Sequence, residues 1–138
     1  MRKLLVSTLF FLCMASAVMA QDPVQVDSKH YKVEFENDEV RVLRIKVGPK
    51  EKSVMHQHPN AVAIFLTDAT GRFTFPKDPA QDITRKAGDV LWTPGTVHLP
   101  ENISDKPFEV ILVELKSKSA ARNVDNRPAT RATSTNGN

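Results

Sequence analysis

Apolar and polar residues alternate along two stretches of this chain, a pattern typical of β-strands that have one buried face. Residues 30–35 alternate in this way and residues 40–47 do so over a longer distance, whereas residues 108–115 have apolar residues on both faces. In the last stretch, one face carries Phe108, Val110 and Leu112, while the other carries Ile111 and Val113. Beyond residue 20, no stretch of useful length has the helical period. The pattern therefore predicts an all-β chain.

Residues 61–66 form an almost wholly apolar run, which is typical of a strand covered on both faces. One face would line the interior of a closed sheet. The other face would lie either beneath a loop or against a second copy of the chain in a homodimer, and the sequence leaves both arrangements open.

Turn-forming residues separate the predicted strands at short intervals. Residues 81–86 are polar and predict a short strand at the edge of a sheet, where charge blocks unwanted pairing. Many short strands between closely spaced turns indicate a jelly-roll sandwich or barrel. The predicted turns are residues 36–38, 48–52, 68–72, 76–80 and 88–89.

The apolar positions of residues 40–47 change parity, from Val40 and Val42 to Leu43 and Ile45. This change predicts a bulge or bend near Leu43, of the kind that lets a sheet close. The basic side chains of the stretch then face water or another subunit; they are Arg41, Arg44 and Lys46.

Residues 1–20 have the pattern of a secretory signal peptide, with Arg2 and Lys3 before an apolar core and cleavage expected after Ala20. The protein is therefore expected in the periplasm or outside the cell, with no membrane association once the leader is removed. The single cysteine, Cys13, lies in the leader, so the mature protein has no disulfide.

The mature chain divides into a loose lead-in over residues 21–29, a single domain over residues 30–116 and a disordered basic tail over residues 117–138. The whole chain carries a net charge of +3, but residues 21–115 hold twelve basic and fifteen acidic residues. The excess of positive charge therefore belongs to the leader and the tail. The domain has no phosphate-binding glycine loop, no Ser-His-Asp set and no basic, aromatic surface for nucleic acid.

Three of the four histidines suggest a metal site. His56 and His58 would share one face of a strand, because their positions differ by two, and His98 would come from a distant strand. Neutral imidazole is the commonest side-chain metal ligand. The fourth histidine, His30, lies away from these segments and is expected to be a structural residue at a surface or an edge.

The segments around these histidines resemble the two motifs of a small single-domain cupin. The second motif matches at Gly88, Pro94, His98 and Asn102, with Gly95 directly after the proline. The first motif matches at the two histidines and loosely at Gly48, but Val62 and Ala63 stand where it has a glutamate. The resemblance covers residues 35–115 and implies a double-stranded β-helix, or jelly-roll barrel, with one divalent transition metal ion inside.

The resemblance implies that His56, His58 and His98 bind the ion, which would be Fe(II), Mn(II) or Zn(II). A three-histidine cupin is similar to the thiol and diketone dioxygenases of this family, whereas the manganese oxalate-type cupins keep the glutamate. The expected function is therefore a dioxygenase-like enzyme for a small organic molecule. A non-catalytic cupin that binds a small ligand, or a structural one, is the alternative. Residues expected near the pocket are Asn102, Trp92, Phe73 and Phe75, and Glu101 would reach it only if its loop turned inward.

Overall fold

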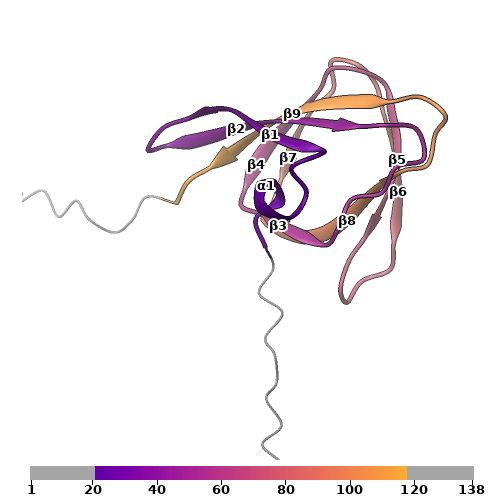
Figure 1. Ribbon diagram of the computed structural model, residues 1–138, viewed down its shortest axis with the longest axis horizontal. Coiled ribbons are helices and arrows are strands. Elements are labelled where there is room, and N and C mark those ends of the chain that lie inside the picture. Colours follow the sequence, from indigo (N-terminus) through magenta and orange to yellow (C-terminus); the bar gives the residue numbers. More distant parts are fainter. Residues whose placement is uncertain (1–20, 118–138) are drawn as a thin grey trace, which may run out of the picture.

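Two antiparallel β-sheets face each other and enclose the core of the domain in the computed structural model, which describes residues 21–117 (Figure 1). One sheet has five strands in the order β1-β2-β9-β4-β7, and the other has four in the order β3-β8-β5-β6. The strands are β1 (Tyr31–Glu36), β2 (Val40–Val47), β3 (His56–His58), β4 (Ala61–Phe65), β5 (Ala69–Thr74), β6 (Gln81–Arg85), β7 (Val90–Thr93), β8 (Thr96–Asn102) and β9 (Phe108–Leu115). The helix α1 spans Pro23–Val26.

The core forms where the two longest strands pair. In the β2–β9 ladder, Leu43 lies opposite Leu112 and Ile45 lies opposite Val110, and all four side chains are buried. Val110 and Leu112 lie on one face of β9, as the sequence predicts, and the structure shows that this face points inward. The all-β prediction is confirmed. Apolar burial of this kind stabilises by roughly 25 cal/mol per Å².

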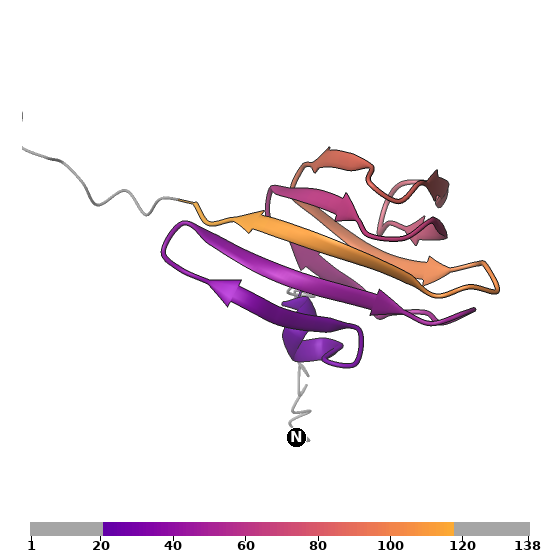
Figure 2. The ribbon, with the colours of Figure 1, turned by 90° about the horizontal axis from the view of Figure 1, so that it is seen from above.

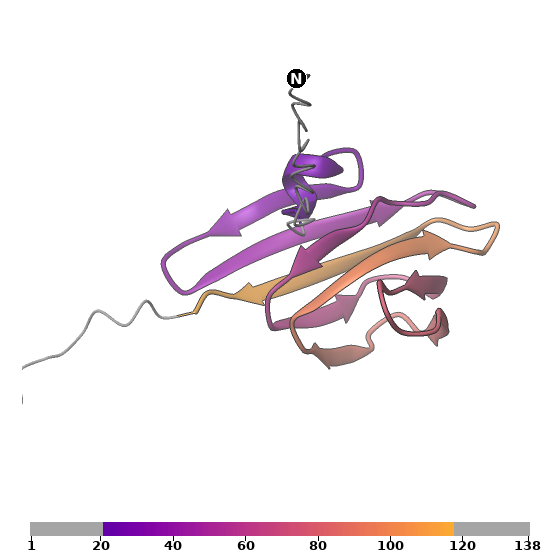
Figure 3. The same cartoon turned by 90° about the horizontal axis from the view of Figure 1, so that it is seen from below.

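The two sheets leave a seam on each side of the domain. At one seam, α1 packs against both edge strands, β1 and β3. The edge strands at the other seam are β6 and β7, which are joined by a turn in which Gly88 has a φ of 90°. Figures 2 and 3 show α1 on one side of the domain and the β6–β7 end on the other.

The lead-in predicted for residues 21–29 is instead an ordered part of the domain. Asp22 caps α1 by accepting a hydrogen bond from the Val24 amide at 2.9 Å, and Pro23 is buried in the first turn. The Asp27 carboxylate accepts from Ser53 Oγ at 2.5 Å, which ties the helix to the loop before β3. The hydropathy pattern does not detect this segment because polar contacts hold it in place.

The bulge lies on a different strand from the one predicted. The register between β1 and β2 shifts at Val33 and Phe35, opposite Leu43 and Val42, so the irregularity belongs to β1. β2 keeps one parity throughout, and its inward face begins with Arg41, whose side chain is 18% exposed. The prediction that Arg41 faces water or another subunit is therefore wrong, because it points inward to a buried carboxylate, that of Glu114.

The turn predicted over residues 68–72 is also wrong in part, because β5 begins at Ala69. Gly71 lies within β5, and a Cβ there would approach the Glu101 carbonyl oxygen to 3.0 Å. The glycine thus permits a close strand contact rather than a turn. The edge position predicted for residues 81–86 is confirmed by β6.

The predicted signal peptide and most of the predicted tail lie outside the described residues. Among residues 21–117, no helix is long and apolar enough to cross a membrane.

Candidate metal centre

The three histidines predicted to bind metal come together inside the domain. β3 pairs with β8 so that His56 lies directly opposite His98, and His58 lies on the same face two residues further along. His56 and His58 are buried, whereas Gln57 between them is exposed. Their candidate ligand atoms, one from each imidazole, all lie within 4.8 Å of one another.

The hydrogen bonds of two rings fix their tautomers. His56 Nδ1 lies 2.7 Å from the Val54 carbonyl oxygen, and His58 Nδ1 lies 2.6 Å from Glu114 Oε1. Both oxygens only accept, so each Nδ1 carries the proton and each neutral ring has its lone pair on Nε2.

Those two Nε2 atoms lie 3.0 Å apart. Two unprotonated ring nitrogens this close repel each other, and a cation bound by both would relieve the repulsion. An ion about 2.1 Å from each nitrogen fits this separation. The donor set therefore suits a metal ion.

Burial also keeps two of the imidazoles neutral. Burial, together with electrostatic repulsion among the histidines, lowers the pKa of His98 to about 3 and that of His56 to about 4. Protons therefore compete with a metal ion for these nitrogens only in acid.

Glu114 is the site residue that the sequence interpretation missed. It is 1% exposed, and Arg41 Nε donates to its Oε2 at 2.6 Å while His58 occupies Oε1. Burial alone raises the pKa of Glu114, but these hydrogen bonds outweigh burial and keep the pKa below its usual range. A carboxylate that holds a ligating imidazole by its other nitrogen fixes the ring and makes it a stronger donor.

A signal for Glu114 was present in the sequence. It continues the inward parity of Phe108, Val110 and Leu112, so it places a charge on a buried face. On β2, Arg41 has the inward parity too, and the two residues lie opposite each other in the ladder. Arg41 Nη1 in turn donates to Asp22 at 2.5 Å, so a chain of hydrogen bonds runs from His58 through Glu114 and Arg41 to the N-terminal segment.

The positions of the missing motif glutamate hold no other carboxylate. Ala63 is buried and Val62 is half-buried. Among the described residues, the candidate metal-binding group consists of the three histidines alone. Glu114 therefore supports a ligand rather than replacing the glutamate.

An apolar cavity of about 380 Å³ adjoins the histidines and is lined in part by His58 and His98. Phe73 stacks on His98, with ring centroids 4.9 Å apart, and Phe75 lies further out at 6.5 Å. Both phenylalanines line the cavity. Trp92 also borders it, but on β7 it alternates with Leu91, which packs against the core, so the Trp92 side chain lies on the outer face of the sheet and is 57% exposed. The size is typical of small-molecule sites.

Asn102, which was predicted to lie near the pocket, is outside the cavity. It is fully buried and is not among the residues that line the cavity, and its Nδ2 donates to the carbonyls of Val47, Gly48 and Lys106. It thus braces the loops at the far end of β8. Glu101 does line the cavity, and its carboxylate lies 3.7 Å from Lys52 Nζ.

His30 has a structural role but not an exposed position. It is 5% exposed, and its two ring nitrogens contact Asp27 at 2.7 Å and Glu51 at 2.9 Å. These contacts tie α1 to the loop that leads to β3.

Comparisons with known proteins agree with this architecture. No protein-family profile and no curated protein matches the chain. A cupin domain from Bordetella pertussis Tohama I has a similar structure, with a TM-score of 0.59 and 22% identity over 63% of this chain and 92% of that one. An RmlC-like cupin with a double-stranded β-helix fold from Methanocaldococcus jannaschii matches with a TM-score of 0.50 and 20% identity, over 64% of this chain and 83% of that one.

A cupin superfamily protein from Desulfitobacterium hafniense DCB-2 also has a TM-score of 0.50, at 18% identity over 63% of this chain and 76% of that one. At these identities the likeness concerns the fold. The described part of the chain thus has the fold of a small cupin domain, a double-stranded β-helix, with a three-histidine group that fits a metal ion.

Proposed function

We propose that this protein is a metal-dependent enzyme, dioxygenase-like, which acts on a small organic molecule. One observation carries the proposal: His56 Nε2 and His58 Nε2 lie 3.0 Å apart, and His98 joins them in one histidine group beside an apolar cavity. The three imidazoles would hold one divalent transition metal ion, Fe(II), Mn(II) or Zn(II).

When bound, the ion would supply Lewis acidity and, as Fe(II), electrons for dioxygen. The protein would supply the rest. Glu114 would keep His58 oriented, and Phe73 would hold the His98 ring by stacking. The apolar wall of the cavity would exclude water from the reacting part of the substrate.

The ligand set favours a dioxygenase-like reaction over the oxalate-type one, because three neutral ligands leave the ion with more positive charge than a glutamate would. The same lack of a carboxylate ligand supports the alternative, a cupin that binds a small ligand or has only a structural role. Fold alone does not choose between them.

Metal analysis and oxygen uptake together test the proposal. We expect about one metal ion per chain, and His98→Ala should lower this content at least tenfold, since three ligands are then reduced to two. His30→Ala is the matched control, because His30 is buried but lies outside the histidine group. With iron(II) restored, the wild-type protein should consume oxygen with a small diketone, phenol or thiol.

Three results would count against the proposal in different ways. A metal-free wild-type protein that binds no added ion would refute the metal site. Bound metal without oxygen uptake across the panel would favour the ligand-binding alternative, particularly if a compound raised the melting temperature without product. Unchanged metal content and stability in His98→Ala would favour a structural role.

The location and the assembly belong to the same proposal. The leader-like residues 1–20 suggest export, so the reaction would take place in the periplasm or outside the cell. The outer face of the five-stranded sheet carries exposed apolar residues, including Phe35 and Trp92, and a second copy of the chain would cover them in a homodimer.

A further inference from the structure

Arg85 differs from the other arginines of the described residues. Arg41 contacts Asp22 and Glu114, Arg44 contacts Glu34 and Glu109, and Arg72 contacts Asp82. Each therefore has a carboxylate partner. Within residues 21–117, Arg85 forms no ion pair, and its Nη1 donates only to the neighbouring Thr84 carbonyl at 2.9 Å.

The Nε atom of Arg85 is the single buried side-chain nitrogen or oxygen in residues 21–117 that lacks a hydrogen-bond partner. A buried, unpaired donor is costly, by roughly 1–3 kcal/mol and more when it is charged. Native structures keep such groups mainly where a ligand, a water or an ion satisfies them. The Nε–H of the guanidinium is thus left without a partner inside the described part of the chain.

β6 directs Arg85 into the cavity. Gln81, Ile83 and Arg85 alternate along the strand and all three line the cavity, whereas Asp82 pairs with Arg72 on the opposite face. β6 is an edge strand, so Arg85 lies at the seam that α1 does not cover.

The guanidinium and the histidines lie toward opposite ends of the cavity. On β5, Ala69 pairs with Arg85 and Thr74 pairs with Leu99, the neighbour of His98. Five residues along a strand correspond to roughly 17 Å between backbones. Inward-pointing side chains shorten this gap, and apolar side chains such as Phe65 and Leu91 line it.

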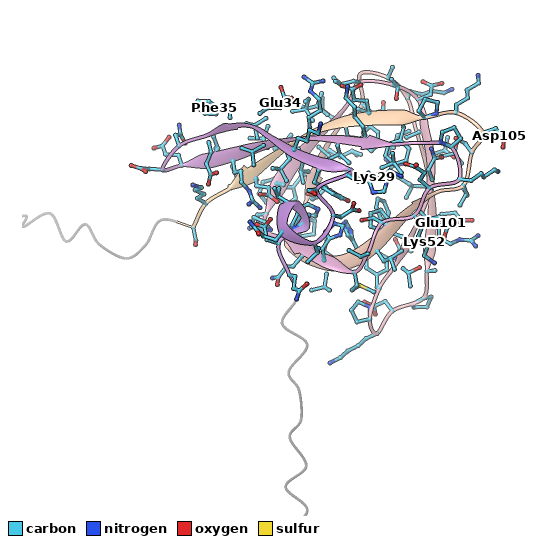
Figure 4. All side chains as sticks on the ribbon, in the orientation of Figure 1. Lys29, Glu34, Phe35, Lys52, Glu101 and Asp105 are labelled. Atoms are coloured by element: carbon cyan, nitrogen blue, oxygen red, sulfur yellow. The ribbon has the colours of Figure 1, made fainter. Side chains whose placement is uncertain are left out.

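The remaining charge on the cavity wall is already neutralised. Glu101 is the only acidic lining residue in the part of the chain that the structure describes, and Lys52 lies beside it, as Figure 4 shows. Arg85 therefore provides the unpaired charge, and its sign is positive.

We propose that the ligand of this cavity is a small, largely apolar carboxylic acid, with its carboxylate bound by Arg85 and its other end directed toward His98. A planar carboxylate matches the guanidinium fork, and such charge-assisted bonds are about twice as strong as neutral ones. The apolar wall accounts for the body of the molecule. The inference names the substrate class of the proposed enzyme and rests on that function only for the chemistry at the histidines.

Titration of the chelator-treated full protein tests the inference without any contribution from metal. The probes are 3-phenylpropanoate and its uncharged match, 3-phenylpropanol, followed by calorimetry. We expect the acid to bind at least tenfold more tightly than the alcohol. Arg85→Gln should weaken the acid at least tenfold and leave the alcohol unchanged, while Arg72→Gln, which alters an exposed arginine of the adjacent strand, should change neither.

Equal affinity for acid and alcohol, no binding of the acid by the wild-type protein, or an unaffected Arg85→Gln would each overturn the inference. Near-ultraviolet circular dichroism shows whether the Arg85→Gln protein is folded. If it is misfolded, Arg85→Lys replaces it. Lysine keeps the charge but not the planar guanidinium, so this variant should retain part of the affinity for the acid. Metal content measured on the same samples separates the two proposals. Acid binding without metal affinity refutes the proposed enzyme but supports the ligand class. Metal affinity without acid binding supports the metal site but overturns the ligand class.

Discussion

Glu114 Oε1 accepts a hydrogen bond from His58 Nδ1 at 2.6 Å, and both residues are buried. The contact fixes the tautomer that leaves Nε2 free for a metal ion. Partners of this kind commonly contribute a factor of 10–100 to metal affinity.

Glu114→Gln should therefore weaken metal binding by roughly 10–100-fold, because the amide keeps the shape but loses the charge that strengthens His58 as a donor. Competition titration with a colorimetric chelator measures the change. Glu109→Gln is the control, since Glu109 lies on the same strand and binds Arg44 outside the histidine group. Equal metal affinity in Glu114→Gln and Glu109→Gln would show that the charge of Glu114 does not contribute to metal binding.

The N-terminal segment should stabilise the domain through Asp22. This residue both caps α1 and pairs with Arg41, which holds Glu114. Asp22→Ala should lower the free energy of unfolding by roughly 1–2 kcal/mol, mostly through loss of the cap, because the ion pair is partly exposed. Urea denaturation measures it, with Asp38→Ala as an exposed control. A loss below about 0.3 kcal/mol, within the usual range for surface changes, would mean that the segment is not needed for the fold.

Acid should loosen the same segment. Hydrogen bonds from Lys29, His30 and the Gly48 amide lower the pKa of Glu51 to about 2, from an ordinary value of 4.5. A carboxyl group with a depressed folded-state pKa stabilises the fold above its unfolded pKa, and this stability is lost as the pH falls from about 4.5 to about 2. The melting temperature should therefore drop across this window, and less steeply in Glu51→Gln. The same slope in Glu51→Gln as in the wild-type protein would contradict this role, and Glu39→Gln, an exposed carboxylate, serves as the control.

The alternation of apolar residues was sufficient to predict the strands, because core pairs such as Leu43–Leu112 follow a simple period of two. It also placed His56 and His58 on one face, and the structure confirms that His98 joins them. The predicted cupin architecture is confirmed by the sheets and by the structural comparisons.

The polar supports of the site were not predicted, because their partners are far apart in the sequence. Glu114 is fifty-six residues from His58. Arg41 has the inward parity, but the change of apolar parity near Leu43 was interpreted as a bulge that would turn it outward. A buried ion pair can be inferred only when both partners and the register between their strands are known. The order of residues 21–29 was missed for the same reason, since Asp22 and Asp27 contact residues of β2 and of the loop before β3.

The outer face of the five-stranded sheet should mediate dimer formation. Its ladders align one apolar residue from each strand in a row across the sheet, from β1 at one edge to β7 at the other; the row consists of Phe35, Val42, Val113, Val62 and Trp92. The two end residues are 53% and 57% exposed, so the row remains open to a partner. A two-fold dimer presents the same patch on both copies, which an apolar row satisfies without charge matching.

Trp92→Ser should raise the dimer dissociation constant about thirtyfold, the effect of losing a buried aromatic anchor worth about 2 kcal/mol. Sedimentation equilibrium across a range of protein concentrations measures the change. Val54→Ser is the matched control, because Val54 is 45% exposed but lies in the loop before β3, outside this sheet. A wild-type protein that stays monomeric, or an equal effect of Val54→Ser, would show that this face remains in contact with water.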